Sequence, residues 1–165
     1  AVLGLPQPIT EERKYIVRVT GDVPSTTTSH ITQTYLVSDP DTEVRLRKRE
    51  WANGNVVNVH TSKKSLGANQ QVETERQVSN ALYESMLLQA DPYRQTIRKH
   101  RKSFIWKGQY FELDTYERQL EGLVILETKG ITDKENVNFP PFLEVVKDIT
   151  GDKKYYNYNL ALHRG

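Results

Sequence analysis

The chain has 165 residues, of which 27% are charged and 36% hydrophobic, and its formal net charge is only +2. A chain of this length suits one domain, which buries about two-thirds of its unfolded surface and needs no disulfide or metal for stability. The sequence contains no cysteine, which excludes a disulfide framework, thiolate zinc sites and cysteine nucleophiles. No apolar run approaches the roughly 20 residues that span a bilayer, and the small net charge predicts weak overall attraction to nucleic acid or membrane.

The first eight residues, Ala1 to Pro8, have the composition of a linker, and no basic-then-apolar signal segment opens the chain. The sequence begins with Ala1 rather than Met, so we expect a domain excised from a longer protein and folded over residues 9–165, with processing of the chain as the alternative. The lack of cysteine is compatible with a reducing compartment. We therefore expect a cytoplasmic protein, either free or peripheral to membranes.

Eight segments have the length and the β-branched and aromatic content of strands, with turn residues between them. In chain order they are Ile9–Thr20, Ile31–Ser38, Thr42–Trp51, Val56–Lys63, Val72–Val78, Thr96–Trp106, Gln109–Tyr116 and Gly122–Thr128. Asn53-Gly54, between the third and fourth segments, is the strongest hairpin signal in the sequence. This pattern favours a sandwich or a barrel, and a barrel leaves no exposed strand edge.

Two segments have a different character. Residues Ser79 to Gln89 carry apolar side chains at helical spacing, with Ser79 as the N-cap. Pro140-Pro141 predicts a second, short helix near Phe142 to Asp148, since proline is tolerated in the first helical turn. The aromatic tail, Tyr155 to Leu162, is expected to pack on the body of the domain.

Charged side chains fall on one face of strand after strand, because successive residues of a strand point to opposite faces. The sets that share a face are Glu12, Lys14 and Arg18; Glu43, Arg45, Arg47 and Arg49; Thr61 and Lys63; Glu73 and Glu75; Lys99 and Arg101; Glu112, Asp114 and Tyr116; and Glu127 and Lys129. A sheet with one solvated face explains each strand taken alone. If the strands close around a cavity, the basic residues can instead grip phosphate oxygens while the acids hold a divalent cation.

In this order, the motifs resemble those of the CYTH family, also called triphosphate tunnel metalloenzymes. The family's first-strand signature, Glu-x-Glu-x-Lys, is similar to Thr10-Glu11-Glu12-Arg13-Lys14, and its paired-arginine strand is similar to Glu43 through Arg49. The further matches are Thr61-Ser62-Lys63, Glu73 with Glu75, Lys99 with Arg101, Glu112 with Asp114, and Leu120 to Glu127. The likeness extends from about Ile9 to Leu162.

The resemblance implies a mainly β fold, an eight-stranded antiparallel β-barrel with a few flanking helices, whose tunnel binds triphosphates, usually with Mg²⁺ or Mn²⁺. The phosphate-binding residues that it implies are Lys14, Arg45, Arg47, Lys63, Lys99 and Arg101. The metal-side candidates that it leaves are Glu12, Glu75, Asp114 and Glu127. Alternatively, Glu73 and Glu75 only neutralise the arginines, with no metal present.

Two positions depart from the family pattern. Thr10 stands where the family has its first glutamate, and Lys129 replaces the second acid of a late Glu-x-Glu pair. Losing a carboxylate and gaining an ammonium disfavours a dication on Coulomb grounds but leaves phosphate binding intact. We therefore expect weakened Mg²⁺ or Mn²⁺ binding, ligand binding with weak or absent hydrolysis, and no assigned catalytic residue.

The tail from Phe139-Pro140-Pro141 to Ala161 resembles a narrower group, the C-terminal CYTH-like domains of proteins with an N-terminal P-loop domain, such as the insect TRPL translocation defect protein. That likeness implies a P-loop companion domain, GTP binding, contact with acidic phospholipids and a role in membrane-protein transport. Arg98 and Lys102 point away from Lys99 and Arg101, so they are the candidates for lipid headgroups, each worth about 1 kcal/mol near an anionic surface. An ordinary solvated face is the alternative.

Three functions stay open from the sequence. The first is a binding or regulatory domain for a nucleoside triphosphate, with GTP favoured, or for a related phosphate ligand. The second is a metal-dependent triphosphatase that hydrolyses inorganic or organic triphosphates. The third is a lipid-binding module in membrane-protein transport, based on the outward basic residues Arg98 and Lys102. No base-reading pocket is legible, and no signature of sequence-specific nucleic-acid recognition is present.

Overall fold

The computed structural model describes residues 5–8, 12–24, 27–68, 70–130 and 137–162. Within these residues the chain forms ten strands and two short α-helices, and it divides into two compact units. Of the described residues, the first unit comprises 5–8, 31–68, 70–97 and 157–162, and the second comprises 12–24, 27–30, 98–130 and 137–156. None of the helices in this part of the chain is long and apolar enough to cross a membrane.

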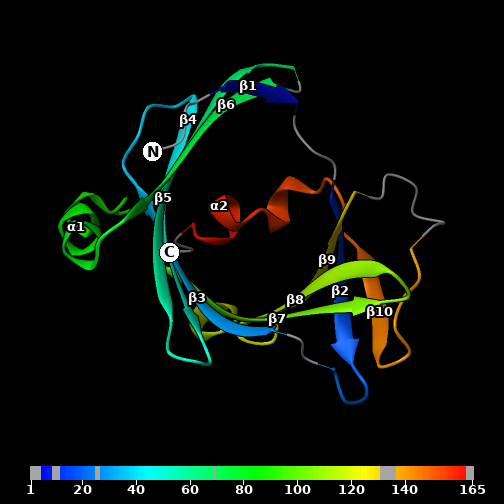
Figure 1. Ribbon diagram of the computed structural model, residues 1–165. Coiled ribbons are helices and arrows are strands. Elements are labelled where there is room, and N and C mark those ends of the chain that lie inside the picture. Colours follow the sequence, from blue (N-terminus) through cyan, green and yellow to red (C-terminus); the bar gives the residue numbers. More distant parts are fainter. Residues whose placement is uncertain (1–4, 9–11, 25–26, 69, 131–136, 163–165) are drawn as a thin grey trace. The chain divides into compact units, whose positions relative to one another are not determined.

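The strands of the first unit lie in the order β1-β6-β5-β4-β3 (Figure 1). Their bounds are β1 Leu5–Pro8, β3 Thr27–Leu36 (of which residues 27–30 fall in the second unit), β4 Thr42–Trp51, β5 Val56–Gly67 and β6 Gln70–Val78. The β4–β5 hairpin turns at Asn53-Gly54, as the sequence predicts, and the Gly54 amide donates a 2.9 Å hydrogen bond to the Trp51 carbonyl. Gly54 has a φ of 91°, which explains the glycine at this turn.

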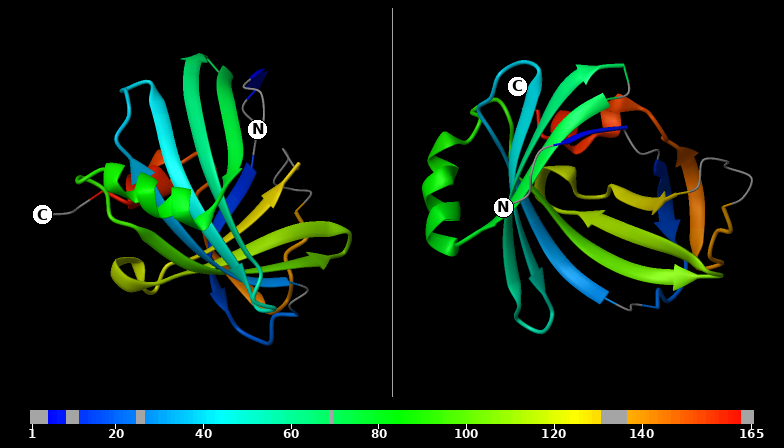
Figure 2. Two further views of the ribbon diagram at one scale, coloured as in Figure 1. Left: turned by 60° about the vertical axis from the view of Figure 1, so that its left-hand side comes forward. Right: turned by 45° about the horizontal axis from the view of Figure 1, so that its top comes forward.

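Helix α1, Asn80–Met86, lies alongside the strands of the first unit (Figure 2) and continues into a 3₁₀ turn over Leu87–Gln89. Ser79 caps the helix, because its hydroxyl accepts a 3.1 Å hydrogen bond from the Leu82 amide. The core beneath it consists of Leu36, Leu46, Val78 and Tyr83. The sequence prediction of a capped helix in this segment is confirmed.

The C-terminal helix α2, Asn157–Leu160, also belongs to the first unit. Its Tyr158 ring packs edge-on against Tyr35 of β3, with the ring centroids 5.1 Å apart. The Arg94 guanidinium lies over the Tyr158 ring, with its Cζ atom 3.4 Å from the ring centroid. The Nε atom of Arg94 also donates a hydrogen bond to the Tyr158 carbonyl. The expected packing of the aromatic tail is therefore confirmed within this unit.

The strands of the second unit lie in the order β7-β8-β9-β2-β10. Their bounds are β2 Glu12–Val19, β7 Ile97–Trp106, β8 Gln109–Tyr116, β9 Val124–Lys129 and β10 Leu143–Asp148. A two-residue turn, Lys107-Gly108, joins β7 to β8, and both residues have positive φ, as a type I′ hairpin requires. One face of this sheet forms the core, lined by Tyr15, Val17, Phe104, Phe111, Leu113, Leu126, Val137 and Leu143.

Three expectations from the sequence are wrong in detail. The sheet is open at β1 and at β10 in the described residues, so it is not a closed eight-stranded barrel. Leu5–Pro8, expected as linker, form strand β1, which pairs with β6. Residues Leu143–Asp148, expected as a helix, form strand β10 on the edge of β2.

Residues Leu143–Asp148 form a strand rather than a helix because β2 offers them an edge to pair with. Val145 and Val146 favour an extended backbone, and two ion pairs tie the strand to β2. These are Arg18 to Glu144 at 3.2 Å and Arg13 to Asp148 at 2.8 Å. Pro140-Pro141 marks the start of an element, but it does not by itself distinguish a helix from an edge strand.

The β7 strand offers a matched pair of residues to test which face carries the core. Phe104 is 1% exposed, whereas its neighbour Ile105 is 64% exposed. We expect Phe104→Ala to lower the free energy of unfolding by about 3–5 kcal/mol, because it opens a cavity in the aromatic core. Ile105→Ala should change it by under about 1 kcal/mol. Urea titration followed by tryptophan fluorescence measures both, and equal losses would contradict the assignment of faces.

Candidate functional site

The polar face of the second unit carries alternating charges across four strands. Burial alternates along β7, with Lys99, Arg101 and Ser103 buried on one face, as the sequence predicts for the first two. The register places Arg101 opposite Asp114, Glu112 opposite Glu127, and Glu127 opposite Lys14. The strand pairing therefore gathers Lys14, Lys99, Arg101, Glu12, Asp114 and Glu127, all predicted from the sequence, onto one sheet.

Asp114 forms ion pairs with two basic residues of this face, Lys99 and Arg101. Arg101 grips it through two hydrogen bonds, from Nε at 2.7 Å and from Nη2 at 2.9 Å, and the Lys99 ammonium lies 2.8 Å from Oδ2. Arg101 also donates to Glu112 at 3.1 Å, and the Tyr110 hydroxyl donates to the same carboxylate. All four charged groups are nearly inaccessible to solvent, so each buried charge is matched by an opposite one.

The electrostatics of Arg101 and Asp114 follow from this pairing. Burial alone would lower the pKa of Arg101, but the hydrogen bonds and charge of Asp114, with that of Glu112, outweigh burial and raise this pKa. Burial alone would raise the pKa of Asp114, but Lys99 and Arg101 outweigh it and hold this pKa well below its usual range. Both groups are therefore charged at neutral pH.

Lys99 behaves differently from its neighbours. Complete burial lowers the pKa of its ammonium from 10.5 to about 8, because desolvation outweighs the attraction of Asp114 and the Arg101 charge adds repulsion. Lys99 is thus still protonated at neutral pH but close to losing its proton. Burial favours the neutral form of such a lysine, whereas a nearby anion favours the charged form.

A second cluster lies at the β2–β9 edge of the same face. The side chains of Glu12 and Glu127 share a hydrogen bond, and burial followed by the Glu12 contact raises the pKa of Glu127. The Lys129 ammonium lies 3.9 Å from Glu12 and 4.0 Å from Glu127, and the Lys14 ammonium lies 3.8 Å from Glu12. The Lys14 ammonium also lies 5.4 Å from the ring centroid of Tyr156.

These acids do not fit a divalent cation in the described structure. Asp114 is occupied by Lys99 and Arg101, and Glu127 is paired with a second carboxyl and an ammonium. No group of three or more histidine or acidic side chains in the described residues is arranged to hold a metal. Glu75, the remaining metal candidate, lies on β6 of the first unit and is exposed. Thr10 lies outside the described residues.

The first unit presents its own charged face. Arg45 and Arg47 alternate with the buried Leu46 on β4, and Arg45 is in register with the buried Thr61 on β5. Lys63 lies between Glu43 on β4 and Glu73 on β6, with which it is in register. The three basic residues predicted on this face are therefore brought onto adjacent strands.

The Arg45 guanidinium is incompletely satisfied. Its Nε atom is buried and has no hydrogen-bond partner, the only buried guanidinium nitrogen without one in the described part of the chain. Arg45 does contact Tyr35, a buried tyrosine that also receives a hydrogen bond from Gln33 at 2.7 Å. Burial, followed by the Glu43 carboxylate, raises the pKa of Tyr35, while Arg45 opposes the rise. A buried donor without a partner destabilises the folded protein, so a ligand oxygen that accepts a hydrogen bond from Arg45 Nε would recover this free energy.

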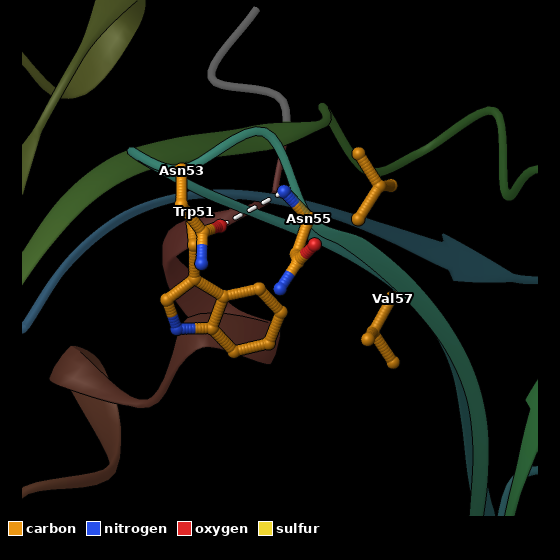
Figure 3. A pocket seen from close by; sticks show the side chains of 5 residues that line it. Trp51, Asn53, Asn55 and Val57 are labelled. Carbon is orange, nitrogen blue, oxygen red and sulfur yellow. Dashed lines mark hydrogen bonds between the residues drawn. The ribbon is translucent and has the colours of Figure 1, made fainter.

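Two pockets open on the first unit. One, of about 200 Å³, is lined by Glu43, Lys63 and Tyr158 together with Pro40, Asp41, Thr42, Ser65 and Gln71. The other, of about 440 Å³, lies at the β4–β5 hairpin and is lined by Trp51, Asn53, Asn55, Val56 and Val57 (Figure 3). In the hairpin the Asn55 amide donates to the Asn53 side chain at 3.0 Å. The first pocket contains a predicted phosphate-binding residue and the second contains none.

The opposite face of β7 carries the predicted lipid-surface residues. Arg98 and Lys102 are both half-buried and lie on the same face as the core residue Phe104, away from Lys99 and Arg101. Partial burial, followed by the charge of Lys102, lowers the pKa of His100, which lies between them in the sequence. The structure thus separates the two basic sets as the alternation predicts.

Sequence reasoning missed several polar residues of these faces. The Ser103 hydroxyl is buried without a hydrogen-bond partner in the described structure, in register with Glu112. Tyr110 and Tyr35 supply or receive hydrogen bonds next to the charged clusters. Counting outward from the two-residue turn at Lys107-Gly108 fixes the β7–β8 register, so the Ser103 and Arg101 partners could have been found from the sequence.

Comparison with known proteins gives a fold assignment. No protein-family model and no curated protein matches the sequence. Two crystal structures of NE1496, one described as a hypothetical protein and one as an inorganic triphosphatase, are similar to this chain. The first has a TM-score of 0.67 and 28% identity over 94% of this chain and 99% of NE1496. The second has a TM-score of 0.66 and 27% identity over 99% and 97% respectively.

A more distant likeness concerns the fold alone. The PH1819 protein from Pyrococcus horikoshii OT3 matches with a TM-score of 0.51 and 20% identity, over 73% of this chain and 78% of that protein. Taken with NE1496 and with the motif order in the sequence, these structures confirm the resemblance to the CYTH, or triphosphate tunnel, fold. The chain is a mainly antiparallel β protein of that fold class. None of these structures tests the narrower likeness to P-loop-containing proteins, which stays a prediction.

The lowered pKa of Lys99 has a consequence for stability. Between pH 8 and 10.5 the unfolded state holds a proton on this lysine that the folded state has lost, so stability should rise with pH across this window. The free energy of unfolding of the wild type, minus that of Lys99→Met, should increase by about 3 kcal/mol from pH 7 to 10.5. Denaturant titrations at intervals of half a pH unit measure this difference. A difference that stays flat across the window would show that Lys99 titrates normally.

Proposed function

We propose that this chain binds a triphosphate and that Arg45 and Arg47 contact its phosphate oxygens. The observation that carries the proposal is the buried Nε of Arg45, which lacks a hydrogen-bond partner in the described structure. Arginine presents a planar fork of donors that matches a phosphate group, so one phosphate oxygen can satisfy this atom. The likeness to an inorganic triphosphatase supports a polyphosphate as the ligand class.

Charge on β4 supports an anionic ligand. Arg45, Arg47 and Arg49 lie on the same face of one strand, where successive same-face residues are only about 7 Å apart. Like charges at this spacing repel, and a multivalent anion relieves the repulsion. Lys63 lines the pocket of about 200 Å³ beside Glu43, and we propose it as a further phosphate contact.

The basic residues of the second unit remain candidates of a different kind. Lys99 and Arg101 already bind Asp114 and Glu112, and Lys14 lies beside Glu12. A phosphate that contacts them has to compete with these carboxylates. We therefore propose Lys14, Lys99 and Arg101 as a separate set of phosphate contacts on the second unit, which exchange a carboxylate partner for phosphate.

We also propose which triphosphates are the candidate ligands. GTP is the nucleotide favoured by the narrower sequence likeness, and inorganic tripolyphosphate is favoured by the name of the NE1496 enzyme. A nucleobase needs its own contacts, so parallel titrations with GTP, ATP and tripolyphosphate separate the two. Equal affinities for all three would assign recognition to the phosphates alone.

Binding to the membrane surface is a separate part of the proposal. Arg98 and Lys102 are the residues that we propose for contact with acidic phospholipids, in a cytoplasmic protein with a P-loop companion domain that serves membrane-protein transport. Flotation with phosphatidic acid liposomes measures this contact. Equal flotation of the Arg98→Glu, Lys102→Glu double variant would remove this surface from the proposal.

Arg45 and Arg47 provide the main test. We expect Arg45→Gln and Arg47→Gln each to weaken tripolyphosphate binding about 10- to 100-fold, since a hydrogen bond to a charged group contributes about 1.5–3 kcal/mol. Arg76→Gln removes a guanidinium from the opposite face of the same sheet and should change affinity less than about twofold. Isothermal titration calorimetry in EDTA measures all three. Equal losses in all three variants, or no binding by the wild type at millimolar ligand, would refute the proposal.

The second candidate function is a triphosphatase that uses a divalent cation. It is favoured by the identity of 27% with the inorganic triphosphatase NE1496 over 99% of this chain. It is disfavoured by the acids of the second unit, which are already paired with cations. The chain's own departures, Thr10 and Lys129, point the same way.

Phosphate release decides between the two functions. With weak or absent hydrolysis, the rate of phosphate release from tripolyphosphate in Mg²⁺ or Mn²⁺ should stay within about tenfold of the uncatalysed rate, far below the acceleration of about 10⁶-fold or more that enzymes reach. A malachite green assay gives this rate. Robust metal-dependent release that Glu127→Gln abolishes would establish the triphosphatase instead.

A further inference from the structure

Lys129 has an unusual position among the charges of the second unit. Its ammonium lies within 4.0 Å of two carboxyl groups at once, those of Glu12 and Glu127. These two carboxyl groups also contact each other, and the Lys14 ammonium lies 3.8 Å from Oε2 of Glu12. Two ammonium groups thus lie within 4.0 Å of this carboxyl pair.

Two ionised carboxyl groups in contact repel strongly in a partly buried site, and either a shared proton or a nearby positive charge relieves this repulsion. Divalent cations supply that charge in many proteins through carboxylate oxygens. Here Lys14 and Lys129 together bring the same two positive charges from the chain itself. The register makes this arrangement unavoidable, because Glu12 pairs with Lys129 and Lys14 pairs with Glu127 across β2 and β9.

The exposure of these side chains affects how easily a cation from solution can compete with Lys129 for the carboxyl pair. Glu127 is largely buried, with a side chain 13% exposed, whereas the Lys129 side chain is 54% exposed. The Glu12 side chain is 33% exposed, so Lys129 is the most exposed of the three groups. A lysine is a compact point charge on a flexible stem, so it can hold this position without fixed coordination geometry.

We propose that Lys129 takes the place of a divalent cation at the Glu12–Glu127 carboxyl pair and thereby makes phosphate binding by the second unit independent of metal. The inference rests on the proposed function for its second half, since it concerns how a polyphosphate is bound. Its first half, the exclusion of a dication from the carboxyl pair, concerns the protein alone. The two halves are tested by separate measurements.

The direct test is Mn²⁺ binding without any phosphate present. Wild-type protein should show no saturable Mn²⁺ binding up to about 1 mM, a limit that corresponds to about 4 kcal/mol. Lys129→Glu replaces a cation by a third carboxylate at this position and should bind one Mn²⁺ at least about tenfold more tightly than the wild type. The loss of the free Mn²⁺ signal in electron paramagnetic resonance measures bound metal without reference to activity.

Two further variants identify the site. Lys147→Glu makes the same change of charge on β10 of the same sheet, where the lysine lies 5.8 Å from a tyrosine ring centroid, and should leave Mn²⁺ binding as in the wild type. Lys129→Glu combined with Glu127→Gln should lose the gained site. If Lys129→Glu proves unstable by circular dichroism, Lys129→Gln serves in its place and should show a smaller gain in the same direction.

Saturable Mn²⁺ binding by the wild type that Glu127→Gln abolishes would overturn the inference. A folded Lys129→Glu that binds no more Mn²⁺ than Lys147→Glu would overturn it equally. The second half is measured by tripolyphosphate titration of the wild type with and without 1 mM MgCl₂, and unchanged affinity supports metal independence. An absence of tripolyphosphate binding would defeat the proposed function but would leave the Mn²⁺ result, and hence the assignment of Lys129, standing.

Discussion

The buried Asp114 carboxylate, held between Lys99 and Arg101, is the interaction on which the second unit depends. Its sheet has an apolar core on one face and charged side chains on the other, and the charged side chains of β7 and β8 are buried as well. Charges removed from water are tolerated only when opposite charges and hydrogen bonds replace the lost solvent. The two-residue hairpin turn supplies that match, because it sets Arg101 directly opposite Asp114.

The two units handle their charges in different ways. In the second unit, each buried cation described above already has a carboxylate partner from the chain. In the first unit, a buried donor of Arg45 has none in the described residues. An anionic ligand therefore gains most at β4, where it satisfies an existing donor, and least at β7, where it must replace an existing partner. This difference is the physical basis for centring the proposed phosphate contact on Arg45 and Arg47.

The partners of the charged side chains also separate triphosphate binding from triphosphate hydrolysis. A metal-dependent hydrolase needs carboxylates that are available to a dication, and phosphate binding needs donors that are available to oxygen anions. The acids gathered on the second unit are paired with lysine and arginine, and a basic donor on the first unit is unfilled. The charge pattern thus supports binding of a triphosphate more directly than it supports its metal-assisted hydrolysis.

The sequence by itself determined the strands with clear boundaries and the side-chain alternation along them. Thr42–Trp51 and Gln109–Tyr116 were predicted with the bounds that the structure has, because turn residues mark both ends and alternation is a local property of an extended backbone. It also predicted that Lys99 and Arg101 share a face. It misjudged Leu143–Asp148 and Leu5–Pro8, because a short segment becomes an edge strand only when a distant strand offers it a partner. The local alternation places Glu127 and Lys129 on one face of β9, but tertiary structure alone decided that both meet Glu12, since the register between strands more than a hundred residues apart is set by their packing.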